Sequence, residues 1–386
     1  MKPSNIVKVE LFKVPPRWLF VKITTEDGLS GWGEPSLEGK AHTMVAAVEE
    51  MQRDLIGRDA NRIEDIFQVL YRGSFYRGGP VLMSAISGIE QALWDIKGKR
   101  LGVPVYDLLG GAVRDKVKIY AWVGGDQPKD VAAAALARVE AGYRAVKMNA
   151  VPKIGWLESP AQVDVIVNTV AQVREAVGWD IGIGLDFHGR VRKAMAKILF
   201  REFEPLKPMF IEEPVLTENF DALPMIAAAS PIPIATGERM YTRWDFKPVL
   251  EQRVVDIIQP DLSHAGGIWE TRKIAAMAEA YDVAVAPHCP LGPIAFASCM
   301  QLQFCTPNGL IQESSMGIHY NAGEIDLLDY LDNPEDFAIK DGSIQRNDRP
   351  GLGIVINEDK VREQARIGHD WYNPVWRTKD GGVAEW

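Results

Sequence analysis

Alternating apolar and polar residues open the chain and predict strands. Residues 6–14, IVKVELFKV, alternate as a half-exposed strand does. Residues 19–35 predict two further strands, joined at Asp27-Gly28, a hairpin turn signal. Apolar residues at helical spacing follow at roughly 40–57, 60–72 and 81–100. Strands followed by helices indicate an α+β unit in the first third of the chain.

From about residue 119 the pattern changes to short apolar runs separated by helical stretches. One helix is well marked, because Ser159 and Pro160 suit its start, Gly178 suits its end, and valines and an isoleucine form a stripe between them. The eight apolar runs are 118–125, 143–149, 181–187, 209–214, 232–238, 254–261, 283–288 and 309–313. Eight buried strands alternating with helices predict a parallel sheet that closes into a barrel.

Polar residues end these runs at a regular interval. In chain order they are Trp122, Lys147, Asp186, Glu212, Glu238, Asp261, His288 and Glu313. The intervals lie between 23 and 27 residues, except the 39 from Lys147 to Asp186, where the loop 150–159 is inserted. In a barrel the carboxyl ends of the strands meet at one mouth, where active sites are built. We therefore expect these side chains to converge.

Three of these residues are acids on successive strands. Asp186, Glu212 and Glu238 would repel one another at one mouth unless a cation were present. Oxygen ligands suit Mg²⁺, so we expect one such ion per subunit; the alternative is three solvated loop acids. His188 lies two residues after Asp186, on the same face of a strand. This pair indicates either one shared metal or a metal beside a proton-transfer group.

The remaining strand ends offer groups for proton transfer and charge neutralisation. Asp261 ends the sixth strand and could orient His288 on the seventh as a base, whereas His264 fits a structural loop residue better. Lys147, two residues before Asn149, could neutralise a substrate carboxylate or form a salt bridge with one of the acids. Glu313 could hydrogen-bond a substrate if protonated, or pair with Lys147.

Composition narrows the class of protein. The net charge of −9 argues against nucleic acid and anionic membranes as partners. We find no signal peptide, and prolines in residues 283–300 favour a strand, a loop and a helix over a membrane span. Three cysteines without a CxxC pair fit the cytoplasm. Walker A and Rossmann glycine motifs are also lacking.

Several motifs resemble the mandelate racemase subgroup of the enolase superfamily. The acid triad is accompanied by IEEP and GE around its second and third members, and ALWDIKGK at 92–99 resembles that family's entry helix into the barrel. The similarity extends to PPRW, FYRGGP, GLDFHGR, FIEEPV, QPDLSHAGG, APHCPLGPIA and VAEW. It implies an α/β fold, a TIM-like (β/α)7β barrel with an α+β capping domain. The capping domain would comprise residues 1–118, with 365–386 returning to it, and the catalytic barrel residues 119–364.

The resemblance also implies an activity. We expect a lyase, a Mg²⁺-dependent sugar-acid dehydratase, with D-galactonate as the preferred substrate. Mg²⁺ would stabilise the enediolate that forms when His288, paired with Asp261, removes the proton alpha to the carboxylate. His188 would protonate the departing 3-hydroxyl, and Glu313 would help to stabilise the intermediate. A homo-octamer is the family expectation.

Alternatives to this activity concern the reaction and the substrate. Racemases of the subgroup carry a basic lysine where this chain has Asn149, which disfavours racemisation. Gluconate, mannonate or a deoxy-sugar acid could replace galactonate, and a catalytically silent sugar-acid-binding barrel is the remaining rival. In the capping domain we expect Arg17 and the loop 75–80 to contact substrate hydroxyls. Trp18, Phe75 and Tyr76 are expected to pack the domain interface.

Overall fold

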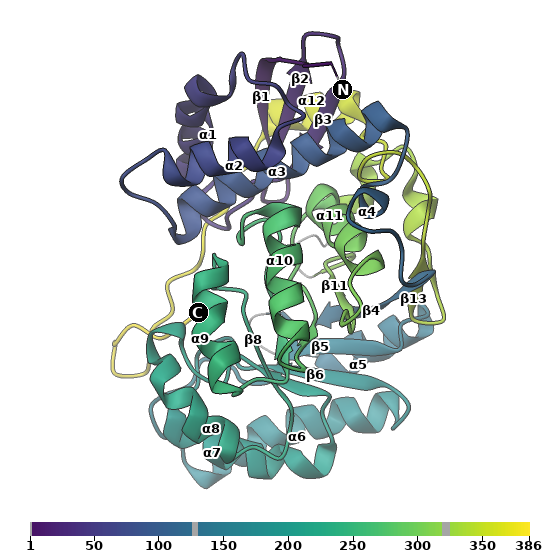
Figure 1. Cartoon of the computed structure of the whole chain (residues 1–386). Helices are drawn as coiled ribbons and strands as arrows, with labels where there is room; N and C mark the ends of the chain where they lie inside the picture. The colour runs from purple at the N-terminus through teal and green to yellow at the C-terminus, as the bar shows by residue number, and fades with distance from the viewer. Residues whose placement is uncertain (1, 126–129, 319–324) are drawn as a thin grey trace.

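The computed structural model describes residues 2–125, 130–318 and 325–386 and shows a cap seated on a barrel (Figure 1). The cap's sheet is antiparallel, in the order β1-β2-β3, and three helices cover it. Its elements are β1 (Ile6–Val14), β2 (Trp18–Thr25), β3 (Ser30–Gly33), α1 (Ala41–Leu55), α2 (Ile63–Arg72) and α3 (Gly79–Leu101). The predicted α+β unit is confirmed, with helix bounds displaced by at most three residues.

Eight parallel strands form the barrel within the described ranges. They are β4 (Lys116–Val123), β5 (Ala145–Asn149), β6 (Gly182–Asp186), β7 (Phe210–Glu212), β8 (Ile234–Thr236), β9 (Ile257–Ile258), β10 (Ala284–Val285) and β11 (Gln312–Ser314). β11 pairs with β4, and a bridge from Val285 to Gly309 joins β10 to the chain entering β11, so the sheet closes. Six of the predicted apolar runs contain one of these strands, and the first and last runs overlap β4 and β11.

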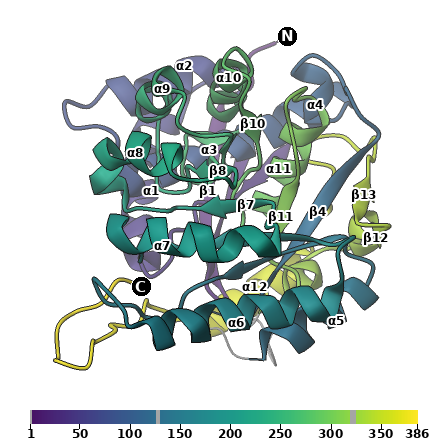
Figure 2. The ribbon, with the colours of Figure 1, turned by 90° about the horizontal axis from the view of Figure 1, so that it is seen from below.

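Seven helices connect the eight strands in this part of the chain, which gives the expected (β/α)7β order (Figure 2). They are α5 (Val131–Glu140), α6 (Pro160–Val177), α7 (Lys193–Phe203), α8 (Leu223–Ala228), α9 (Arg243–Gln252), α10 (Gly267–Glu279) and α11 (Pro293–Phe304). In α6, Ser159 accepts a hydrogen bond from the Gln162 N–H, and the predicted stripe faces the core. Residues 283–300 form a strand, a loop and a helix, as expected.

Shorter elements link and extend the two parts. They are α4 (Val105–Leu108), η1 (Glu204–Leu206), η2 (Thr217–Ala222), η4 (Leu327–Tyr330), η5 (Pro334–Phe337), β12 (Ile339–Lys340), β13 (Ser343–Gln345) and α12 (Glu358–Ile367). α12 lies against the cap, where Glu358 pairs with Lys22 at 2.6 Å and Arg362 with Glu10 at 3.2 Å. The domain bounds at 118 and 365 stay a prediction. Among the described residues no helix combines the length and apolar character that a membrane span requires.

Two buried glutamates join the cap to the starts of barrel helices. Glu90 of α3 accepts hydrogen bonds from the N–H groups of Ile268 at 2.7 Å and Trp269 at 2.9 Å, at the start of α10. Glu34, which follows β3, accepts from Gly292 and Ala295 at the start of α11, at 2.7 and 2.9 Å. The first N–H groups of a helix have no partner within it, so the cap supplies acceptors that the barrel lacks.

Glu90→Ala is expected to lower the free energy of unfolding by about 2–4 kcal/mol, because it leaves buried N–H groups without an acceptor. Urea unfolding followed by circular dichroism measures the change. Glu49→Ala, on the exposed face of α1, is the control and should change the free energy by less than about 0.5 kcal/mol. Equal urea midpoints for the two variants would show that Glu90 does not join the domains.

Candidate active site

The predicted strand-end residues meet at the carboxyl end of the barrel, beneath the cap. Asp186 is in register with Asn149 on one side and with Glu212 on the other. Asp186, Glu238 and His288 line a cavity of about 340 Å³. The cavity is also lined by Arg17, Trp122, Lys147, His188, His264 and Glu313. The convergence that the 25-residue period predicted is therefore present.

Lys147 is the cation inside this group of acids. Its Nζ lies 2.9 Å from Glu212 Oε1, 2.9 Å from Glu313 Oε1 and 3.8 Å from Asp186 Oδ2, and the side chain is buried. Burial opposes the charged form, but Glu212 and Glu313 raise the pKa of Lys147 well above its usual value. Of the two roles expected for Lys147, the structure contains the salt bridge.

The structure brings Asp186 and Glu238 together with His188 rather than with Glu212. One ligand atom from each of these three residues lies within 4.8 Å of the others. Glu212 instead accepts hydrogen bonds from Lys147 at 2.9 Å and from Gln259 Nε2 at 2.7 Å. Burial raises the pKa of Glu212 to about 7 even though Lys147 opposes this. Glu212 as a metal ligand stays a prediction.

The contacts of His188 indicate which ring nitrogen carries its proton. Arg190 Nη2 lies 3.1 Å from Nδ1, and a guanidinium can only donate, so Nδ1 accepts and the proton resides on Nε2. Nε2 faces Glu238 Oε1 at 3.8 Å. Burial, Arg190 and Arg239 hold the pKa of His188 well below its usual value. A protonated Nε2 cannot bind a metal, which favours separate roles for Asp186 and His188.

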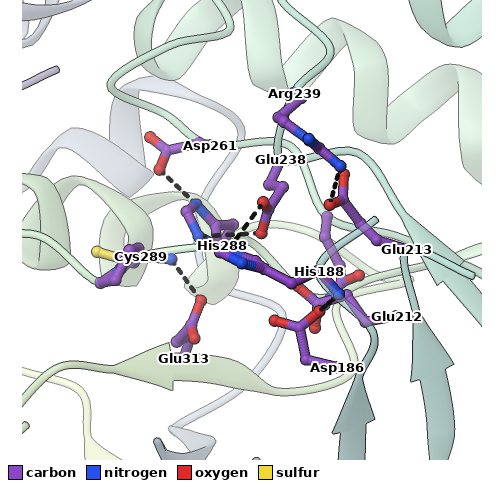
Figure 3. Close-up of polar contacts among 12 residues, drawn as sticks. Asp186, His188, Glu212, Glu213, Glu238, Arg239, Asp261, His288, Cys289 and Glu313 are labelled. Atoms are coloured by element: carbon purple, nitrogen blue, oxygen red, sulfur yellow. Dashed lines mark hydrogen bonds and ion pairs between the residues drawn. The ribbon is translucent and has the colours of Figure 1, made fainter. Parts of the chain in front are cut away.

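His288 lies between two carboxylates (Figure 3). Its Nδ1 is 2.8 Å from Asp261 Oδ2, and its Nε2 is 3.2 Å from Glu238 Oε2. Burial opposes protonation, but Glu238, Glu313 and Asp261 raise the pKa of His288 well above its usual value. Asp261 is itself held in place by the Ser263 N–H at 2.6 Å. The expected pairing of His288 with Asp261 is present.

Of the remaining candidates, Glu313 and His264 line the cavity and Asn149 does not. Glu313 accepts a hydrogen bond from the Cys289 N–H at 2.8 Å. Burial raises the pKa of Glu313, but the charges of Lys147 and His288 outweigh this and bring the pKa below its usual value. Asn149 donates to the Gly125 carbonyl at 3.3 Å and is not among the described residues that line the cavity. His264 lies 2.8 Å from Ser84 Oγ, which ties the sixth loop to the cap.

Some of the predicted cap residues line the cavity, and others pack in the interior of the protein. Arg17 lines the cavity and pairs with Glu38 at 2.7 Å. Trp18 is fully buried and packs on Tyr330, as expected. The expectation that Phe75 and Tyr76 pack the interface was wrong, because their loop projects from the chain and leaves them 90% and 80% exposed.

Sequence reasoning missed several residues of the site. Glu213 is fully buried, has a φ of 45°, and forms an ion pair with Arg239, which lines the cavity. Both residues directly follow a predicted ligand, in IEEP and GER, and that adjacency was the available signal. Arg190 and Trp386 also contact His188. No spacing pattern in the sequence points to Trp386.

The buried acids fit a hard divalent cation. Apart from its ion pair with His288 at 3.2 Å, Glu238 Oε2 accepts no hydrogen bond from any described residue, and burial together with Glu213 raises the pKa of Glu238 well above its usual value. Burial likewise raises the pKa of Asp186. A cation removes this penalty, because it favours the ionised form of each acid. Asp186 and Glu238 therefore offer oxygen ligands of the kind that Mg²⁺ prefers.

Comparison with protein families matches both parts of the chain. Residues 15–110 match the N-terminal domain of mandelate racemase and muconate lactonizing enzyme. Residues 130–360 match the enolase C-terminal domain-like model. These two ranges correspond to the cap and to the barrel.

Individual relatives are similar over nearly the whole length. The chain is 58% identical to a D-galactonate dehydratase of Pectobacterium atrosepticum and 55% identical to one of Variovorax paradoxus, each over 99% of this chain and 100% of the relative. A crystal structure of an enolase from Agrobacterium radiobacter, bound to sodium and L-malate, superposes with a TM-score of 0.90. It is 32% identical and covers 98% of this chain and 99% of that chain.

Mg²⁺ is expected to stabilise the protein by about 2.7 kcal/mol at a hundred times its dissociation constant. Glu238→Gln should abolish this gain, because it replaces a charged oxygen ligand with an amide. Urea unfolding with and without MgCl₂ gives both values. Asp164→Asn, on the exposed face of α6, is the control and should keep the full gain. An undiminished gain in Glu238→Gln would place the metal elsewhere.

Proposed function

The chain belongs to the mandelate racemase and muconate lactonizing enzyme family of the enolase superfamily, and we propose that it is a Mg²⁺-dependent D-galactonate dehydratase. The reaction removes water from D-galactonate and gives 2-dehydro-3-deoxy-D-galactonate. Two D-galactonate dehydratases, at 58% and 55% identity over 99% of the chain, support this substrate.

One observation carries the dehydratase assignment: two imidazoles flank a single carboxylate. His288 Nε2 lies 3.2 Å from Glu238 Oε2, and His188 Nε2 lies 3.8 Å from Glu238 Oε1. For a substrate held beside Glu238, we place carbon 2 near His288 and carbon 3 near His188. Dehydration needs this arrangement, because a proton leaves carbon 2 and a hydroxyl leaves carbon 3.

The substrate carboxylate binds beside the acids at the mouth. Asp186, Glu212 and Glu238 would hold Mg²⁺, which would supply Lewis-acid stabilisation of the charge on that carboxylate. Lys147 lines the cavity and adds positive charge there. Glu313, bound to Lys147 and to the Cys289 N–H, fixes the lysine in this position.

The two histidines carry out the proton transfers. Asp261 accepts from Nδ1 of His288, which leaves Nε2 to take the proton from carbon 2. The Arg190 guanidinium donates to Nδ1 of His188, so Nε2–H faces the cavity and assists the departure of the 3-hydroxyl. Asn149 offers no second base, which separates this site from a racemase.

Assembly and location stay predictions. We expect a homo-octamer in the cytoplasm. The three cysteines are free and buried, which fits a reducing compartment.

Incubation of the protein and Mg²⁺ with a panel of sugar acids, followed by a ketone-specific assay, tests the activity. D-galactonate is expected to give the keto acid, and gluconate and mannonate much less.

His288→Asn should lower kcat by about 10²–10⁴-fold, because the base is lost, while stabilisation by Mg²⁺ remains. His42→Asn, 79% exposed, is the control. If another acid reacts and D-galactonate does not, the substrate assignment fails; unchanged turnover in His288→Asn refutes the base.

His188→Asn is expected to separate the two halves of the reaction. Dehydration should slow by about 10²-fold or more, because assistance to the leaving hydroxyl is lost. Exchange of the carbon-2 proton with deuterated water should continue, because it needs only His288. Proton NMR of D-galactonate incubated with the variant follows both. Loss of exchange together with dehydration would mean that His188 acts at carbon 2 or only in binding.

A further inference from the structure

After α12 the chain leaves the cap and returns to the mouth of the barrel. In Figures 1 and 2 this yellow segment loops outward before its end comes back against the body of the protein. His369 Nε2 lies 3.3 Å from the Trp18 carbonyl oxygen, on the cap side. Glu385 pairs with Arg192 at 2.9 Å, on the barrel side. The segment 369–386 is thus anchored to both parts.

The indole of Trp386 contacts two other indoles of this segment. The ring of Trp386 lies 6.3 Å from the rings of Trp371 and Trp376. An arginine lies over each of these two rings. Cζ of Arg17, from the cap, is 4.9 Å from the centre of the Trp371 ring, and Cζ of Arg190, from the barrel, is 4.7 Å from the centre of the Trp376 ring. Cation–π contacts of this kind stabilise the rings from both domains.

Trp386 packs against the imidazole of His188. Its ring lies 5.4 Å from the imidazole, at an interplanar angle of 60°, and Trp386 lines the cavity together with Asp186, Glu238 and His288. Its Nε1 has no hydrogen-bond acceptor among the described residues. The indole ring itself is therefore held in the wall of the cavity by packing and not by a hydrogen bond from its N–H.

We propose that Trp386 contacts carbons 4 to 6 of the sugar acid and limits the length of the acid that the cavity accepts. This inference rests on the proposed function, which puts the carboxylate at the acids and carbon 3 at His188. The rest of the substrate then extends past His188, where the Trp386 ring lies. The cavity of about 340 Å³ is at the small end for ligand sites, so a large ring in its wall controls size.

Binding measurements isolate this contact from turnover. In a His288→Asn background with Mg²⁺, adding Trp386→Ala should weaken D-galactonate binding about tenfold by calorimetry. D-Glycerate has the same first three carbons and lacks carbons 4 to 6, so its affinity should change less than twofold. Trp386→Phe should keep most of the D-galactonate affinity. Trp179→Ala, a 65% exposed tryptophan outside the cavity lining, is the matched control.

Turnover measurements test the length limit. For Trp386→Ala with an intact His288, the ratio of kcat/KM for a seven-carbon to that for a six-carbon aldonic acid should rise at least tenfold over wild type. Trp386→Leu takes its place if circular dichroism shows that the alanine variant does not fold. An unchanged ratio, or equal loss of affinity for D-glycerate and D-galactonate, overturns the proposal. Absence of turnover of every sugar acid by the wild type instead refutes the proposed function.

Discussion

The mouth of the barrel depends on the burial of several acids around one lysine. Lys147 contacts Glu212 and Glu313 at 2.9 Å and lies 3.8 Å from Asp186, with its side chain almost fully covered. Burial, with Glu213 adding to it, raises the pKa values of Glu238 and Asp186, and Lys147 only partly opposes this at Asp186. The residual negative charge makes the site receptive to a divalent cation and, through it, to an anionic substrate.

The two histidines gain distinct properties from their neighbours. Asp261 accepts from Nδ1 of His288, whereas Arg190 donates to Nδ1 of His188. The carboxylate behind His288 fixes a proton on its Nδ1, whereas the guanidinium behind His188 leaves the proton of that ring on Nε2. The two rings face the two oxygens of Glu238, so their difference lies in the residues behind them.

Strand periodicity allowed the sequence to predict the barrel and most of the residues at its mouth. Side chains that end parallel strands must converge, so Asp186, Glu238 and His288 could be placed without a structure. The orientation of Glu212 could not be predicted, because it depends on Gln259 and Lys147 from other strands. The position of Trp386 depends on a segment that follows no period.

The hydrogen bonds of Glu34 and Glu90 have a consequence for how such enzymes can be recombined. Each glutamate comes from the cap, and the backbone N–H groups that donate to it come from the start of a barrel helix. Gly267, with a φ of 89°, leaves the space that Glu90 occupies, since a Cβ there would lie 2.1 Å from Glu90 Oε2. A chimera that takes its cap from one relative and its barrel from another therefore has to inherit both glutamates and this glycine as a set. The loops of the cap that line the cavity are free of that requirement and can diverge.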